Sequence, residues 1–408
     1  MKQSSRINVN LMKDYNKQLV LRTIQKHGPI SRVEIANRIE LSRPSVSEIV
    51  SILIEEQWIE EKPSEIKVRG RQPIPLDINK EKKVIVGLEI GAYCTTVIVC
   101  NLKAEILYDI QIEMNTHKEP DQIIEILGQQ INSITQTYKE QGIAVLGIGV
   151  GMHGLVDTER GRNIFAPNLG WRNVEIKTIL ENITQLKVLM DNDCNSAALA
   201  EMWFGQGKDE SNFISVIVDY GVGASIINGG SIFKGAHHVT GQIGHVTIDP
   251  DGPLCSCGNY GCLETLTSEK AILKKVKRKL KMGETSRIIN QKINIEDLTI
   301  EDFYEAVNQG DELCLNIAEE IGRNLGLGFT ILINLFGPKF IVLGGSLTQI
   351  SDVLIPNIMN VIQLKVMGEE AKQTPIVTSE LENDLYTIGA ASLIVEDIFS
   401  LPKPNKRF

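Results

Sequence analysis

The sequence lacks a hydrophobic run long enough to span a bilayer, because its longest apolar stretches are interrupted by glycine, asparagine or charged residues within a few positions. It also shows no secretory leader, and seven cysteines without such a leader argue against a disulfide scaffold. We therefore expect a cytoplasmic protein with no membrane partner, whose cysteines are reduced and free to bind metal.

Length and composition limit the architecture. The chain has 408 residues, with 42% hydrophobic and 23% charged residues, which is typical of a soluble globular protein. That length exceeds one ordinary domain, so we expect two or three domains.

The chain also lacks an overall positive charge, since its formal net charge is -9. The balance is uneven, however. Residues 1–80 contain 14 basic and 10 acidic residues, whereas the remainder contains 28 basic and 41 acidic residues. A basic N-terminal segment on an acidic body suggests that only the first part meets a polyanion.

One stretch concentrates metal-binding side chains. Residues 241–264 read GQIGHVTIDPDGPLCSCGNYGCLE, with glycines placed where a tight turn needs positive φ. Three thiolates and one imidazole form a closed tetrahedral set that suits a structural Zn²⁺. The predicted ligands are His245, Cys255, Cys257 and Cys262. A loop with unpaired thiols is the alternative.

The first 80 residues show the pattern of a winged helix-turn-helix. Residues 14–26 predict a helix, which His27-Gly28-Pro29 ends. Ser31 and Glu34 predict a capping box at the start of a short second helix, and a third helix runs from about residue 42 to residue 57. The segment that follows predicts a two-stranded wing. A small helical bundle that only mediates dimer contacts is the alternative.

Within this domain, the start of the third helix is the predicted DNA-reading surface, because the first residues of a recognition helix touch base edges in the major groove. Other hydroxyl and guanidinium groups are expected to grip phosphates or to reach a minor groove from the wing. The predicted DNA-binding residues are Ser31, Arg32, Ser42, Arg43, Ser45, Ser47, Arg69 and Arg71.

Residues 81–408 predict an α/β body, because groups of strands return after helices. The similarity of GLEIGAYCTTVIV to VIVDYGVGASIINGG suggests two related halves with a cleft between them. After a buried strand, Met190-Asp191-Asn192-Asp193 places polar groups where α/β proteins bind ligands. Asp193 is able to accept a proton or a hydrogen bond from a sugar hydroxyl, while helix capping by Asp193 or Asn195 is the equal alternative.

The run C-x-C-G-x2-G-C-x-E after G-H resembles the signature of the ROK family (repressors, open reading frames and sugar kinases), and the resemblance covers nearly the whole chain. Its N-terminal domain is similar to that of the family's repressors, and the general layout to xylose repressors of Gram-positive bacteria. The resemblance implies a two-lobed, actin-like, hexokinase-type body with a sugar cleft.

The resemblance also implies roles for matching residues. The metal ligands match the family's zinc site, and Asp193 matches its catalytic base. The implied sugar contacts are Asn168, Asn192, Asp193, Gln242, His245 and Glu264. Gln242 stands where the family usually has glutamate, and His153 stands where it usually has proline.

The phosphate loops depart from those of the family's kinases. Glu89 and Tyr93 occupy the first loop, and Asp219 and Tyr220 occupy the second, although Gly344-Gly345 matches the nucleotide-side glycine pair. Carboxylates repel an anion, so we expect Asp193 to be a vestigial base and the protein not to be an enzyme.

Together these features predict a sugar-responsive transcriptional repressor that binds operator DNA and is released by a monosaccharide, with xylose as the first candidate. A homodimer or a dimer of dimers is expected, since the winged helices of a dimer bind two half-sites. A sugar kinase carrying a DNA-binding domain and a repressor controlled by a protein partner are the alternatives.

Overall fold

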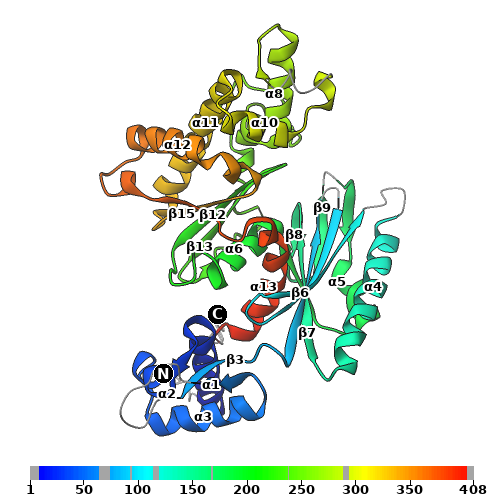
Figure 1. Cartoon of the computed structure of the whole chain (residues 1–408), viewed down its shortest axis with the longest axis vertical. Helices are drawn as coiled ribbons and strands as arrows, with labels where there is room; N and C mark the ends of the chain where they lie inside the picture. The colour runs from blue at the N-terminus through cyan, green and yellow to red at the C-terminus, as the bar shows by residue number, and fades with distance from the viewer. Residues whose placement is uncertain are drawn as a thin grey trace, which may run out of the picture. The chain divides into compact units, whose positions relative to one another are not determined.

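The computed structural model describes residues 9–63, 74–91, 94–113, 119–166, 169–237, 239–287 and 294–401. The chain forms two compact units (Figure 1). The first unit combines Met1–Phe204 with Tyr386–Phe408, and the second is Gly205–Leu385. Among the helices described, none is both long and apolar enough to cross a membrane.

The first unit begins with the winged helix-turn-helix that the sequence predicted. Its helices are α1 (Val9–His27), α2 (Arg32–Arg38) and α3 (Arg43–Glu55). The strands β1 (Ile30–Ser31), β2 (Ile59–Glu61) and β3 (Pro75–Ile78) form an antiparallel sheet in the order β1-β3-β2. The capping box between Ser31 and Glu34 is present as predicted.

Apolar side chains from all of these elements form the core of the small domain. The fully buried members are Val20, Ile24, Ile35, Val46, Val50, Leu53, Leu76 and Ile78. The third helix therefore buries the stripe that its periodicity predicted, and its opposite face stays exposed. Val33 of α2 is 41% exposed and does not belong to this core.

The main sheet of the first unit has the order β11-β7-β4-β5-β6. Its strands are β4 (Lys83–Ile90), β5 (Cys94–Asn101), β6 (Ile106–Glu113), β7 (Ala144–Met152) and β11 (Val188–Asn192). The pairs β4–β7 and β7–β11 are parallel, and the others are antiparallel. A smaller sheet contains β8 (Leu155–Asp157), β9 (Arg162–Ala166) and β10 (Trp171–Val174).

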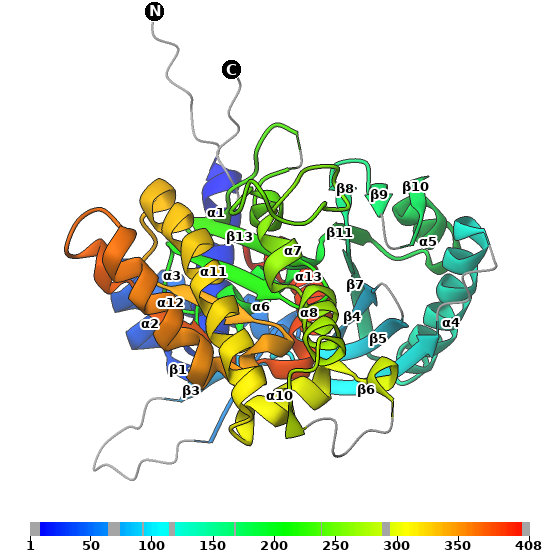
Figure 2. The ribbon, with the colours of Figure 1, turned by 90° about the horizontal axis from the view of Figure 1, so that it is seen from above.

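Helices cover both faces of this main sheet (Figures 1 and 2). On one face lie α4 (Pro120–Glu140) and α5 (Ile176–Thr184). On the other lie α6 (Asp193–Trp203) and α13 (Leu385–Phe399). Glycines permit close packing on that second face, because a Cβ at Gly149 would stand 1.8 Å from the carbonyl oxygen of Ala390.

The second unit repeats the strand arrangement of the first. Its sheet has the order β14-β13-β12-β15-β16, with strands β12 (Phe213–Val218), β13 (Val222–Asn228), β14 (Ser231–Ile232), β15 (Ile341–Gly344) and β16 (Ile376–Thr378). In both sheets the first three strands form an antiparallel meander, one later strand pairs in parallel with the first strand, and a further strand pairs in parallel with that later strand. The two related halves expected from the sequence are present.

Helices of 5 to 25 residues complete the core of the second unit. These are α7 (Leu263–Thr267), α8 (Glu269–Lys281), α10 (Ile300–Asn308), α11 (Glu312–Phe336) and α12 (Ser351–Lys365). Helix α11 packs along α12 and also contacts α7, α8 and α10. Two short 3-10 helices, η1 (Ile243–His245) and η3 (Ser346–Ile350), follow glycine-bearing turns near the sheet.

Candidate functional site

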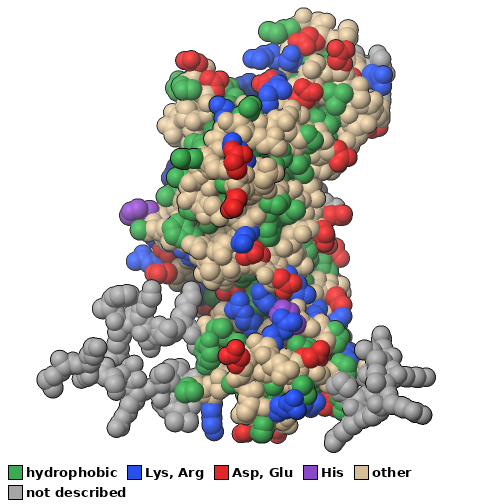
Figure 3. Space-filling model, turned by 90° about the vertical axis from the view of Figure 1, so that its left-hand side faces the viewer, with side chains coloured by type: hydrophobic (Ala, Val, Ile, Leu, Met, Phe, Trp, Pro, Cys, Tyr) green, Lys and Arg blue, Asp and Glu red, His purple; other side chains and the backbone are tan. Residues whose placement is uncertain are grey.

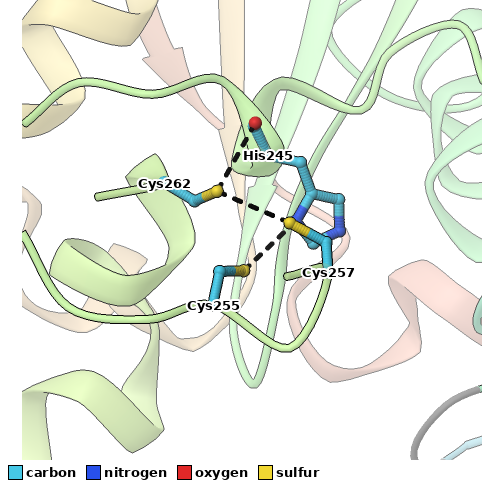
Figure 4. Close-up of side chains that lie close together, drawn as sticks. All are labelled: His245, Cys255, Cys257 and Cys262. Carbon is cyan, nitrogen blue, oxygen red and sulfur yellow. Dashed lines mark hydrogen bonds between the residues drawn. The ribbon is translucent and has the colours of Figure 1, made fainter. Parts of the chain in front are cut away.

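The predicted metal ligands converge in the second unit. The ligand atoms of His245, Cys255, Cys257 and Cys262 all lie within 4.8 Å of one another. Figure 4 shows the imidazole and the three sulfurs turned toward a common point. The Sγ atoms of Cys257 and Cys262 are 3.7 Å apart, and His245 Nδ1 lies 3.5 Å from the Sγ of Cys255.

These separations fit a tetrahedral zinc site. With zinc–sulfur bonds of about 2.3 Å, the sulfurs of a regular tetrahedron stand about 3.8 Å apart. The separation of 3.7 Å between Cys257 and Cys262 agrees with that value. All four positions of the tetrahedron are filled by protein, so the donor set suits a structural metal. Elsewhere among the residues that the structure describes, no comparable cluster occurs.

The loop that carries the thiols is shaped by its glycines. Gly258 and Gly261 have φ angles of +93° and +61°, as the sequence predicted. A Cβ at Gly261 would stand 1.4 Å from the carbonyl oxygen of Asp249, so only glycine fits there. The loop is then joined to the upstream segment by an isolated bridge between Thr247 and Cys262.

The pKa values of the clustered thiols are shifted in opposite directions. Burial, together with the neighbouring thiols, raises the pKa of Cys262 to about 12. Burial acts in the same direction on Cys257, but hydrogen bonding from the backbone of Asn259 and from the other thiols lowers its pKa overall. A metal ion held by these residues would supply the positive charge that three deprotonated sulfurs need.

In the first unit, the polar loop after β11 forms the start of α6. Asn192 is the N-cap, and its side chain accepts a hydrogen bond from Cys194 N at 2.9 Å. The alternative that Asp193 or Asn195 is the N-cap of this helix is therefore wrong. Asn195 instead donates to the carboxylate of Asp191 at 2.9 Å.

Asp193 is partly exposed beside His153. Its Oδ2 lies 3.1 Å from Nδ1 of His153, and the two side chains are 18% and 31% exposed. The amide of Asn192 donates to the carbonyl oxygen of Gly154 at 2.9 Å, which fixes the loop after β7 beside the start of α6. The sequence singled out His153 only as a departure from the family, and its contact with Asp193 required the structure.

The other predicted sugar contacts belong to the second unit, except Asn168, which lies outside the described residues. Gln242 precedes η1, and His245 ends it. Glu264 lies in the first turn of α7, where its Oε2 accepts a hydrogen bond from Val222 N at 3.3 Å. The elements η1, α7 and β13 contact one another, so these three residues belong to one region.

In the second unit, the glycine-bearing loops for which the family resemblance implies a nucleotide role are bridged by hydrogen bonds between their own residues. The backbone N–H of Ser346, which follows Gly344-Gly345, donates to Oδ1 of Asp219. The hydroxyl of Ser346 donates to Glu269 and lies 2.9 Å from the hydroxyl of Tyr304. Burial raises the pKa of Glu269 despite the hydrogen bond from Ser346. The sequence carried no signal for Glu269 or Tyr304.

The predicted DNA-reading residues divide by their local roles. Arg43 and Ser47 are exposed at the start of α3, and Ser45 is half-buried. The Ser42 side chain caps α3 by accepting from Ser45 N at 3.2 Å. Ser31 is buried as the cap of α2, and Arg32 pairs with Glu61 at 2.7 Å. Arg69 and Arg71 lie outside the described residues.

Acidic and basic side chains are mixed over most of the face that Figure 3 shows, apart from one small group of basic side chains around a histidine in its lower part. The excess of basic residues in the first 80 residues therefore does not extend over that whole face.

The fold and these groups define a class: a winged helix-turn-helix joined to an actin-like, hexokinase-type body. Comparison with known families agrees. A model described as the ROK family matches residues 85–397, and a model described as winged helix-turn-helix DNA-binding matches residues 13–60. The chain belongs to the ROK family.

Similar proteins cover both parts of the chain. A xylose repressor of Caldicellulosiruptor bescii is 30% identical over 97% of this chain and 99% of its own. The N-acetylglucosamine repressor of Escherichia coli O157:H7 is 33% identical over 95% of this chain and 94% of its own. The predicted family and fold are thus confirmed.

Among solved structures, one is similar to nearly the whole chain and another to about three quarters of it. A ROK family transcriptional regulator described as a homologue of the Escherichia coli MLC protein has a TM-score of 0.83 and 31% identity, over 95% of this chain and 97% of its own. A ROK family glucokinase from Streptomyces griseus, in complex with glucose and AMPPNP, has a TM-score of 0.65 and 25% identity, over 76% of this chain and 98% of its own.

Proposed function

We propose that this protein is a sugar-responsive transcriptional repressor. Residues 1–80 bind operator DNA, and residues 81–408 bind a monosaccharide, with xylose as the first candidate. The proposal depends on one observation: a single chain contains both a helix α3 whose first turn is exposed and a body that matches the ROK family. The full-length similarity to named repressors supports it.

In this proposal, Arg43, Ser45 and Ser47 contact bases, because they occupy the accessible start of α3. Ser42 and Arg32 contact phosphate at the edge of the same surface, and Ser31 contributes through the cap of α2. Arg69 and Arg71 extend the contact to a minor groove. Two copies of the domain, in a homodimer or a dimer of dimers, bind two half-sites.

The sugar contacts proposed are Asn168, Asn192, Asp193, Gln242, His245 and Glu264. Hydroxyl groups of a sugar need both donors and acceptors, and this set offers amides, carboxylates and an imidazole. The partial exposure of Asp193 beside His153 supports its place in the set. His245 also belongs to the metal cluster, so a structural Zn²⁺ would hold its imidazole in one orientation.

We further propose that the protein does not transfer phosphate. In the second unit, a carboxylate already accepts the backbone N–H that follows the glycine pair, since Ser346 N donates to Asp219. A nucleotide phosphate would have to displace that carboxylate and face its charge. At an effective dielectric of ~20, two like charges at ~4 Å repel by about 4 kcal/mol.

The test uses purified full-length protein and a DNA duplex that the protein itself selects from a random pool. We expect gel retardation of that duplex and its release by one sugar of a panel that includes D-xylose. Selection of no duplex would overturn the proposal that the protein binds an operator. Retention that no sugar changes, with no heat on sugar titration, would instead favour control by a protein partner.

A sugar kinase is the second candidate, because Asp193 remains partly exposed and the body is similar to a ROK glucokinase. Release of ADP with the same sugar panel tests it. We expect no turnover above that of the Asp193→Asn variant. Turnover that Asp193→Asn abolishes would establish the kinase.

A further inference from the structure

We propose that helix α6 transmits occupancy of the sugar site to the DNA-binding domain, with Trp203 as the positioning residue at its far end. This inference rests on the proposed function, since it concerns the regulation of the same site. All of the residues involved lie in the first unit.

The two ends of α6 meet two different parts of the molecule. At its start, the N-cap Asn192 and the next residue, Asp193, are proposed sugar contacts. At its end, Trp203 is only 1% exposed. An α-helix of 11 residues is about 16 Å long, so α6 alone covers the distance between these ends.

The Trp203 ring is a docking point for α1 of the DNA-binding domain. The guanidinium of Arg22 lies 5.2 Å from the ring centroid, and the ammonium of Lys26 lies 5.6 Å from it. Both separations are within the range of cation–π attraction, which strengthens when the groups are desolvated. The position of α1 is therefore linked to the position of the indole.

Trp203 is held on its other sides by α13. Its Nε1 donates to Oε2 of Glu396 at 3.0 Å, and its ring centroid lies 5.8 Å from that of Phe399. The backbone carbonyl of Ile398 in turn accepts a hydrogen bond from Gln18 of α1. The C-terminal ends of α6 and α13 thus form one contact surface for α1, which we call the seat of α1.

The body of α6 is built to move as one piece. Residues 196–203 are all buried. Helix α13 touches the α6 backbone directly, because a Cβ at Gly389 would stand 2.8 Å from Ala197 N. Close-packed interiors shift between discrete arrangements instead of deforming gradually. A displacement of the N-cap therefore reaches Trp203.

Other contacts give the DNA-binding domain a pivot away from Trp203. Nζ of Lys103 lies 2.7 Å from Oδ1 of Asp77, and these side chains are 19% and 9% exposed. Gln25 donates to the carbonyl oxygen of Leu102 at 2.7 Å, so both contacts meet the turn after β5. Movement of the seat at Trp203 against this fixed turn would rotate the domain and change the spacing of two recognition helices in a dimer.

The transmission requires that the sugar prefer one position of the N-cap of α6, since a ligand shifts an equilibrium only through unequal affinity for the two states. The coupling is also reciprocal, so operator DNA must favour the other position of α6. These two consequences can be measured separately.

The test compares the full-length wild type with the double variant Arg22→Met, Lys26→Met, which removes both cations while leaving the buried indole in place. The matched control is Lys17→Met. Lys17 lies on the same helix but pairs with Glu56 of the DNA-binding domain at 2.6 Å. The DNA is the duplex that the wild type selects, and the sugar is D-xylose.

We measure the ratio of operator dissociation constants with and without saturating D-xylose. We expect at least about tenfold in the wild type and in Lys17→Met, and less than about threefold in the double variant. The dissociation constant for D-xylose itself, from calorimetry, should stay within about threefold, which a loss of folding would not allow. A double variant that keeps the full ratio would overturn the inference.

A second measurement does not depend on the sugar. Binding of the duplex should slow amide hydrogen exchange across residues 193–203 by at least about threefold in the wild type and not in the double variant. Unchanged exchange in the wild type would overturn the inference. If D-xylose leaves operator affinity unaltered but exchange responds to DNA, the proposed inducer is wrong and the transmission through α6 stands.

Discussion

The main sheets of the two units have the same strand order, but the polar groups at the ends of their strands differ in exposure and in hydrogen bonding. In the first unit, the loop after β7 and the start of α6 leave His153 and Asp193 partly exposed. In the second unit, the loop after β15 is closed, because Ser346 N donates to Asp219 and the Ser346 hydroxyl donates to Glu269.

This difference separates what strand order determines from what single side chains determine. Strand order places polar loops at the carboxyl ends of parallel strands in both units. Whether the backbone donors of those loops can bind a ligand depends on whether a side chain of the protein already accepts their hydrogen bonds. In the second unit that side chain is Asp219, which satisfies the same kind of backbone donor that a phosphate would need.

The largest expected effect concerns the metal cluster, which belongs to the second unit only. Structural zinc binds to zinc-finger peptides with ~10 kcal/mol or more, so we expect Cys262→Ser to lower the free energy of unfolding by at least about 3 kcal/mol. Calorimetric unfolding and the metal content per chain test this prediction. Cys94→Ser, a half-buried thiol of the first unit, is the control and should retain the metal.

Wild-type protein that is purified without a metal, and that a chelator leaves equally stable, would contradict this prediction. In that case the four side chains would form a loop with unpaired thiols, and the two units would not differ in their dependence on metal.

The second prediction tests how tightly the closed loop is built. Gly345 has φ +91° and ψ 178°, a region that essentially only glycine occupies. A Cβ there would stand 2.6 Å from the carbonyl oxygen of Val218 and 2.8 Å from Oδ1 of Asp219. We expect Gly345→Ala to cost about 3 kcal/mol in the free energy of unfolding.

Gly283→Ala is the matched control, because Gly283 has φ +92° with no atom within 4 Å of an added Cβ. Its cost should be only that of the left-handed backbone, about 1–2 kcal/mol. Equal losses in both variants, measured by denaturant unfolding, would show that the loop after β15 is not crowded.

The third prediction compares the two carboxylates directly. Asp219→Ala leaves Ser346 N without its acceptor and should cost about 2 kcal/mol of stability. Asp193→Ala should cost less than about 1 kcal/mol, because Cys194 N keeps the side chain of Asn192 as a second acceptor. Sugar binding, measured by calorimetry, should be lost only in Asp193→Ala. The reverse order of stabilities would break the comparison.

Local features of both units could be predicted from the sequence. The metal ligands lie close together in the chain, and Gly258 and Gly261 show the expected positive φ. The capping box at Ser31 and Glu34 depends on residues three positions apart. Alternation of apolar residues and glycine turns predicted the strands of both sheets, because side-chain periodicity is a property of each strand alone.

Contacts between distant segments could not be predicted. The sequence indicated that Asp219 would repel an anion, but its donor Ser346 lies 127 positions away. The docking of Arg22 on Trp203 likewise depends on how α1, α6 and α13 pack. Even within one loop, the sequence left capping by Asp193 or Asn195 as an even alternative to a ligand contact, whereas backbone geometry assigns the N-cap to Asn192.

The smallest expected effect is a difference in pH dependence between the units. Burial raises the pKa of Glu269 in the second unit, so the folded state binds its proton more tightly than the unfolded chain does. The stability that this proton contributes is present below the unfolded pKa of about 4.5 and is lost as pH rises through the folded pKa. Glu269→Gln keeps an acceptor for Ser346 and should therefore gain stability relative to the wild type between pH 4 and pH 7.

In the first unit, hydrogen bonds from Lys80 and Asn101 lower the pKa of Glu105, so Glu105→Gln should show the opposite trend and lose stability relative to the wild type as pH rises. Denaturant unfolding across this pH range checks both signs, and parallel curves for the two variants would contradict the raised pKa of Glu269 and the lowered pKa of Glu105.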